Sequence, residues 1–211
     1  VGVTGRHISS LNSRGVVATT RSDRRVTSDD LGRVLESARS ITIPSDRRLL
    51  HVIPRYYILD GHVAVKEPVG MHGFRLDVET HIVTGAAASV QNLMKSVRGA
   101  GVEIDNLVLS PLAVGETVLS EDERQAGVIV ADIGAGTTDV AIFKEGCVWH
   151  SAVLPVGGYQ VTRDIAIGLG IPNDLAEEMK KKYSNLMNTN DVGAEHGELD
   201  VGNRHTVSYR E

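Results

Sequence analysis

The chain has 211 residues, with 22 Lys and Arg against 27 Asp and Glu, so its formal net charge is −5. Its 41% hydrophobic and 23% charged residues are typical of a globular protein and exclude a disordered one. The acidic balance and the 4% aromatic content argue against nucleic acid as a partner. The single cysteine excludes a disulfide framework and a multi-cysteine metal site, and no apolar run approaches the roughly 18 residues of a membrane span.

The first ~80 residues predict a small α+β unit. Thr27 and Asp30 have the spacing of a capping box, and the apolar residues after them recur on one helical face. Gly5 and the polar segment 12–15 interrupt the preceding apolar stretches, which predicts short strands separated by turns. Strands are expected at 1–3, 7–12, 15–20, 51–53, 56–59 and 75–83.

The rest of the chain alternates between helical and extended patterns. The acidic segment 120–125 is interpreted as a linker. We expect helices at 87–98, 111–119, 159–169 and 174–187, and strands at 104–109, 128–133, 139–143 and 147–153. The polar tail after residue 188 carries at most one strand, near 198–201. The expected domains are 1–80, 81–125, 126–187 and 188–211.

The strongest motif is Asp132-Ile133-Gly134-Ala135-Gly136-Thr137-Thr138-Asp139. It lies between two apolar strands, so a carboxylate at a strand end is followed by a Gly/Ala/Thr turn. Glycine permits positive φ and close backbone approach, which lets successive N–H groups converge on a phosphate. Flanking aspartates can hold Mg²⁺ through water. The alternative is an ordinary hairpin turn, but the full octet favours phosphate binding.

The octet resembles the second phosphate loop of the actin-like ATPases. Further segments resemble one family of that class, FtsA of bacterial cell division: 7–15 (HISSLNSRG), 50–54 (LHVIP), 68–71 (PVGM), 81–85 (HIVTG), 119–124 (LSEDER) and 161–166 (VTRDIA). The resemblance implies an α/β fold of the actin-like (ribonuclease-H-like) class. It also implies that residues 1–80 are the inserted subdomain of this family, 81–125 the second part of the first lobe, and 126–187 the start of the second lobe.

The resemblance also implies a set of ligand-binding residues. ATP and Mg²⁺ are the implied ligands, and Asp132 and Asp139 the residues that would hold the metal through water. Ala135 stands where the family usually has glycine. The other implied cofactor-binding residues are Asp132, Gly134, Gly136, Thr137, Thr138 and Asp139 of the octet, the pair Gly157-Gly158 before a helix, and Glu177 and Lys180 on a later helix. For Gly157-Gly158 the alternative is a plain turn before a helix. For Glu177 and Lys180 it is a solvated, charged helix face.

One departure bears on catalysis. Ser110 stands where related ATPases have a glutamate that orients the attacking water, so weak or no ATPase activity is expected and no catalytic residue is assigned.

The function implied by the resemblance is that of a scaffold. It would bind ATP, self-associate into actin-like filaments, anchor the FtsZ ring to the cytoplasmic face of the membrane at the division site, and meet later division proteins through residues 1–80. Because the chain opens at Val1 and stops at Glu211, we expect a piece of a longer protein, whose membrane-binding helix lies outside it. The alternatives are a pilus-assembly actin-like ATPase and an actin-like small-molecule kinase.

Overall fold

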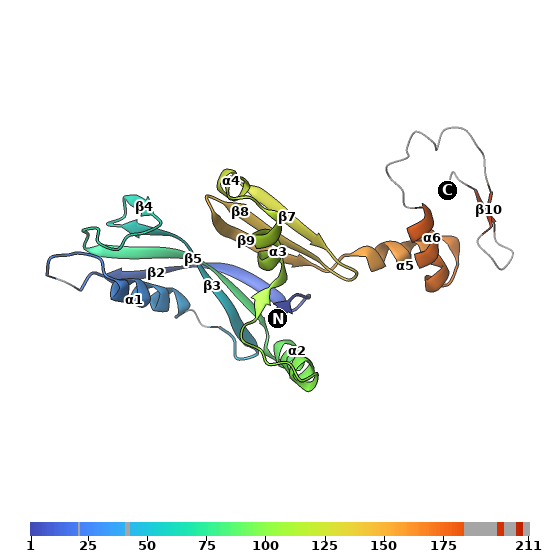
Figure 1. Ribbon diagram of the computed structural model, residues 1–211, viewed down its shortest axis with the longest axis horizontal. Coiled ribbons are helices and arrows are strands. Elements are labelled where there is room, and N and C mark those ends of the chain that lie inside the picture. Colours follow the sequence, from blue (N-terminus) through green and yellow to red (C-terminus); the bar gives the residue numbers. More distant parts are fainter. Residues whose placement is uncertain (21, 41–42, 184–197, 201–205, 209–211) are drawn as a thin grey trace. The chain divides into compact units, whose positions relative to one another are not determined.

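The computed structural model describes residues 1–20, 22–40, 43–183, 198–200 and 206–208 (Figure 1). Val1–Ile133 and Thr137–Pro155 form one compact unit. Gly134–Gly136 and the described residues from Val156 onward form a second. Within the described ranges, no helix is long and apolar enough to cross a membrane.

A four-stranded antiparallel sheet in the order β2-β5-β3-β4 dominates the first unit (Figure 1). Its strands are β2 (Ile8–Ala18), β3 (Arg47–Leu59), β4 (Val63–Val65) and β5 (Arg75–Ala86). Helix α1 (Ser28–Arg39) packs on this sheet and buries Val34 and Ala38 against Leu76 and Val78. β5 continues six residues past position 80, so the sheet extends beyond the first expected domain boundary.

The expected capping box at the start of α1 is confirmed. The Asp30 N–H donates to the Thr27 hydroxyl at 3.3 Å, and the Thr27 N–H donates to the Asp30 carboxylate at 3.0 Å. Two amides at the helix start are thereby satisfied without water.

Gly15 explains an incorrect expectation. The sequence predicted two strands with a break at 12–15, but β2 pairs with β5 without interruption from Ile8 to Ala18. A Cβ atom at Gly15 would lie 2.2 Å from the carbonyl oxygen of Val34 and 2.6 Å from the amide nitrogen of Ala38. Glycine is needed here because α1 packs directly on the backbone of the strand, not because the chain turns.

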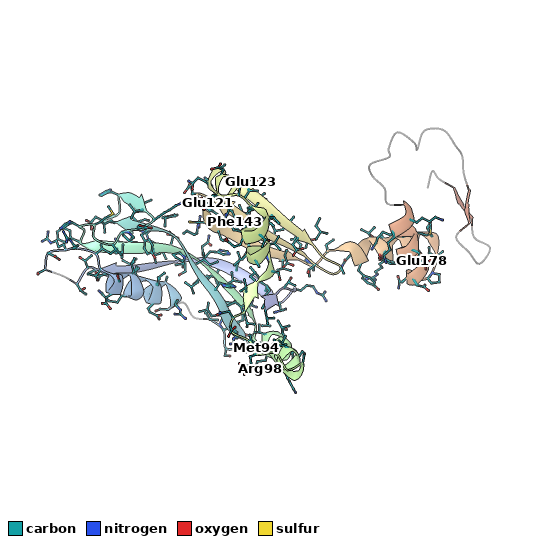
Figure 2. All side chains as sticks on the ribbon, in the orientation of Figure 1. Met94, Arg98, Glu121, Glu123, Phe143 and Glu178 are labelled. Atoms are coloured by element: carbon teal, nitrogen blue, oxygen red, sulfur yellow. The ribbon has the colours of Figure 1, made fainter. Side chains whose placement is uncertain are left out.

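Among its described residues, the first unit also contains two short strands and three further helices. β1 (Gly2–Val3) pairs in parallel with β6 (Val108–Leu109). The helices are α2 (Ala87–Gly99), which carries Met94 and Arg98 in Figure 2, α3 (Ser110–Val118) and α4 (Glu121–Ala126). The linker expected at 120–125 is wrong, because α4 occupies it. Ser120 and Glu123 form a second capping box, a Ser-x-x-Glu signal already visible in the sequence.

A three-stranded antiparallel sheet in the order β7-β8-β9 carries the octet. The strands are β7 (Val128–Ile133), β8 (Thr138–Lys144) and β9 (Cys147–Leu154). Phe143 of β8, labelled in Figure 2, is buried with Val130 and Ala141. A Cβ atom at Gly115 of α3 would lie 2.4 Å from the Phe143 ring, so α3 packs closely on this sheet.

The second unit contains a helix pair. α5 (Gly158–Leu169) packs on α6 (Asn173–Tyr183) through Ala166, Ile171 and Ala176. Of the helix expected at 174–187, residues 184–187 lie outside the described residues. β10 (Glu198–Asp200) and β11 (Thr206–Ser208) form an antiparallel pair. β10 agrees with the strand expected near 198–201, of which residue 201 is not described.

Candidate functional site

The octet forms a tight β7–β8 hairpin. Asp132 pairs with Asp139 and Ile133 with Thr138 in the antiparallel ladder, which leaves residues 134–137 as the turn. Gly134 and Gly136 are not among the glycines with positive φ, so the conformational argument for these glycines does not hold. A Cβ atom at Gly136 would meet nothing within 4 Å. The backbone is therefore open to close approach at this position.

The turn residues Gly134 and Ala135 hold the start of α5. The N–H groups of Gly158 and Tyr159 donate to the carbonyl oxygens of Gly134 and Ala135 at 2.9 and 2.7 Å. A Cβ atom at Gly157 would lie 2.5 Å from the Gly134 carbonyl oxygen. The glycine pair is therefore part of a packed junction, and two of the helix's first amides are already used.

Glu177 and Lys180 form a cluster with Thr162, which the sequence analysis did not single out. Lys180 Nζ lies 2.7 Å from Glu177 Oε2, 2.9 Å from Thr162 Oγ1 and 3.1 Å from the Gly158 carbonyl oxygen. Thr162 Oγ1 also lies 2.5 Å from Glu177 Oε2. The three donors of the ammonium group thus each have an acceptor.

The electrostatics of this cluster keep Glu177 ionised. Hydrogen bonds from Lys180 and Thr162 lower the pKa of Glu177 to about 2. The second oxygen, Oε1, lies 3.5 Å from Lys181 Nζ at the edge of the cluster. Glu178, labelled in Figure 2, is exposed on the same helix and lies outside the cluster. Glu177 is therefore a fixed, charged acceptor, whereas Glu178 is a solvated one.

A pocket of about 350 Å³ collects these groups in the second unit. Its lining includes four of the residues expected from the sequence, and it adds Tyr159, Thr162, Asn173 and Asp174. The full lining is Ala135, Gly158, Tyr159, Thr162, Asn173, Asp174, Glu177 and Lys180. Thr162 was detectable in principle, because it lies four residues after Gly158 and thus on the same helical face. The size is at the lower end of that of small-ligand sites.

The two aspartates lie opposite one another in the first unit. Asp139 is buried, and the Thr4 hydroxyl donates to its Oδ1 at 2.6 Å. Burial raises the pKa of Asp139, the Thr4 hydrogen bond partly offsets that rise, and the charge of Asp132 adds to it. A cation would relieve this repulsion, and two carboxylates fit the oxygen preference of Mg²⁺. They supply only two protein ligands, which suits a metal held mostly by water. No sequence signal indicated Thr4, 135 residues away.

Ser110 begins α3, and its hydroxyl donates to the carbonyl oxygen of Val3 at 3.3 Å. The side chain therefore joins α3 to β1. A hydroxyl held in this way is a poor substitute for a carboxylate that orients water.

The fold and the sequence of this chain both resemble those of known proteins. A chain of the PilM-PilN type IV pilus biogenesis complex matches with a TM-score of 0.56 and 20% identity, covering 85% of this chain and 49% of that one. Residues 5–84 match the family model described as the SHS2 domain inserted in FTSA. The fold match and the inserted domain confirm the actin-like α/β fold class expected from the sequence.

Sequence relatives narrow the class to one family. Residues 129–211 match the family model of the cell division protein FtsA. The cell division protein FtsA of Pseudomonas aeruginosa is 48% identical over 184 residues, which cover 87% of this chain and 44% of that protein. That of Bacillus subtilis is 38% identical over 182 residues, covering 86% and 41%. The chain belongs to the FtsA family, and it spans less than half the length of these relatives.

Proposed function

We propose that this protein is a cell-division scaffold that binds ATP in the pocket of the second unit. The observation that carries the proposal is the cluster of Thr162, Glu177 and Lys180 beside the turn formed by 134–136. A fixed carboxylate acceptor suits the hydroxyl groups of a ribose, and an open glycine backbone suits a phosphate. Both chemistries occur together in a nucleotide.

The residues of the chain divide the work as follows in this proposal. Gly134, Ala135, Gly136, Thr137 and Thr138 offer backbone and hydroxyl donors to phosphate oxygens. Glu177 accepts hydrogen bonds from the sugar, and Lys180, whose donors are already engaged, orients Glu177. Mg²⁺, when bound, supplies positive charge for the phosphates, and Asp132 and Asp139 would hold it through water. Hydrolysis is slow because Ser110 replaces the water-positioning group.

The scaffolding role is proposed for the whole protein. It self-associates into actin-like filaments, anchors the FtsZ ring to the cytoplasmic face of the membrane at the division site, and meets later division proteins through residues 1–80. Exposed apolar side chains in that segment support a contact role, since Val69 is 50% and Phe74 57% exposed.

Titration of the protein with ATP and Mg²⁺ by calorimetry tests the nucleotide site. The variant Glu177→Gln should weaken binding about tenfold, or about 1.4 kcal/mol, because a neutral amide is the weaker acceptor. The matched variant Glu178→Gln should bind as the wild type does. Equal affinities for Glu177→Gln and the wild type, with both folded, would contradict the assignment.

Sedimentation with and without ATP tests the scaffold. We expect ATP-dependent pelleting of the protein and co-pelleting of FtsZ. The variant Phe74→Ser should reduce pelleting and leave ATP affinity unchanged. Pelleting that is the same in the presence and absence of ATP would argue against a nucleotide-controlled filament.

A further inference from the structure

Two β-bulges face one another in the first unit. In the β3–β5 ladder, Pro54 pairs with Thr80 and Tyr56 with Glu79, so Arg55 is the extra residue. In the β8–β9 ladder, Ile142 pairs with His150 and Phe143 with Val148, so Trp149 is the extra residue. A bulge re-aims a side chain at the cost of regular pairing and is often found beside a functional site.

The two bulged residues meet. The guanidinium carbon of Arg55 lies 3.9 Å from the centroid of the Trp149 ring and 5.7 Å from that of Tyr56. A cation over an aromatic face gains attraction from the ring quadrupole. A guanidinium group that packs on an aromatic ring still has its in-plane N–H donors to offer to an anion.

Arg55 is buried without a counter-charge. The residue is only 9% exposed, and its Nε–H is buried without a hydrogen-bond partner. Within the described part of the chain, no carboxylate forms an ion pair with Arg55. Buried charges are normally paired, because an unpaired one carries a large desolvation cost.

A pocket of about 370 Å³ lies at this contact. Arg55, Tyr56, Lys66, Cys147 and Trp149 are among the residues that line it. Lys66 adds a second positive charge. The Glu145 carboxylate also lines the pocket, but it lies 3.7 Å from Lys144 Nζ and so already faces a cation. Two cations and two aromatic rings therefore face a space large enough for a small ligand.

We propose that this pocket binds an oxyanion, a carboxylate or phosphate group carried by a small organic molecule. Arg55 donates to the oxyanion, Lys66 adds charge, and Trp149 and Tyr56 contact the apolar part. Arginine suits this role because its planar donors match both groups. The bulges and the unpaired charge are then the structural cost of a preformed site. The proposal is independent of the nucleotide site, since it uses none of its residues.

Trp149 is the only tryptophan of the chain, so its fluorescence reports on this pocket alone. The protein is titrated separately with sodium phosphate and sodium acetate at constant ionic strength against sodium chloride. We expect a saturable change with a millimolar midpoint in at least one titration, and the comparison shows which oxyanion is preferred. The absence of saturation with both anions would overturn the proposal.

Arg55→Met removes the charge and keeps an unbranched stem over Trp149. The matched control is Arg48→Met, an exposed arginine of the same strand that does not line this pocket. We expect Arg55→Met to weaken anion binding at least tenfold and Arg48→Met to leave it unchanged. Equal weakening by both variants would indicate a general charge effect and overturn the proposal.

Urea unfolding without added anion separates a ligand-binding role from a structural one. If Arg55 serves a ligand, Arg55→Met unfolds at the same or a higher urea concentration, because an unpaired buried charge has been removed. Clear destabilisation would show that Arg55 is structural and would overturn the proposal. Should Arg55→Met fail to fold, Lys66→Gln, an exposed change, must weaken anion binding about threefold; unchanged binding would overturn the proposal.

Discussion

Nε2 of His81 on β5 lies 2.9 Å from Oγ of Ser151 on β9, a pair 70 residues apart that joins the four-stranded sheet to the three-stranded sheet. The other ring nitrogen, Nδ1, lies 2.8 Å from Oδ1 of Asn12 on β2. His81 is fully buried, so this imidazole is a structural bridge with both nitrogens used.

The His81 bridge predicts a stability that falls in acid. Burial, with the charges of His150 and Arg55, lowers the pKa of His81 to about 4 from 6.5. The unfolded chain therefore takes up a proton as the pH falls below 6.5, while the folded chain does so only near 4. Stability from this group is complete above 6.5 and is lost between 6.5 and 4, by about 3 kcal/mol at most.

Urea unfolding at several pH values in this window checks the prediction. His81→Gln, which does not titrate, should be less stable near neutral pH and show a shallower pH dependence. Some pH dependence of stability should remain in both the wild type and His81→Gln, because burial also lowers the pKa values of His7 and His51. An unchanged slope in the variant would mean that His81 does not carry the effect.

Gly15 and Gly32 form a matched pair for the packing of α1 on β2. Gly15→Ala should destabilise the fold by roughly 1–3 kcal/mol, because its Cβ would overlap the backbone of α1. Gly32 lies within α1 with nothing within 4 Å of a Cβ, so Gly32→Ala should stabilise by about 0.5–1 kcal/mol. Chemical denaturation measures both, and the same sign for the two changes would refute the close packing.

Substitutions at Gly136 and Gly157 should have different effects, the first on ATP binding and the second on stability. Gly136→Val should fold normally, since the space around its Cβ is open, yet weaken ATP binding at least tenfold by obstructing the phosphate. Gly157→Ala should lower the thermal midpoint, because its Cβ would overlap the Gly134 carbonyl. Calorimetry and thermal melts distinguish the two effects. Wild-type ATP affinity in folded Gly136→Val would exclude a phosphate-binding turn.

Thr162 should act by holding Glu177 and Lys180. Thr162→Val keeps the shape but removes the hydroxyl, so we expect ATP affinity to fall three- to tenfold and the pKa of Glu177 to rise from about 2. Thr162→Ser should restore both. Titration of the Glu177 carboxyl by NMR gives a readout that simple loss of packing would not move. A variant with an unchanged Glu177 pKa would show that Thr162 has no positioning role.

The features that depend on residues close together in the chain could be predicted from the sequence. The capping box of Thr27 and Asp30, the hairpin of the octet, and the helix with Glu177 and Lys180 on one face each depend on residues within a few positions of one another. The second capping box, at Ser120 and Glu123, is equally local, although the acidic composition of the segment predicted a linker. Spacing determines such features because neighbours along the chain share one helix or turn.

The contacts between residues far apart in the sequence were determined by tertiary packing. The bond from Thr4 to Asp139, the bridge from His81 to Ser151, and the stacking of Arg55 on Trp149 each join residues that no local pattern connects. Gly15 is the clearest case, because a glycine in an extended segment predicts a turn until a helix is placed against it. Sequence spacing specifies which elements form, whereas burial against a distant element specifies what each side chain contacts, and only the folded chain supplies that partner.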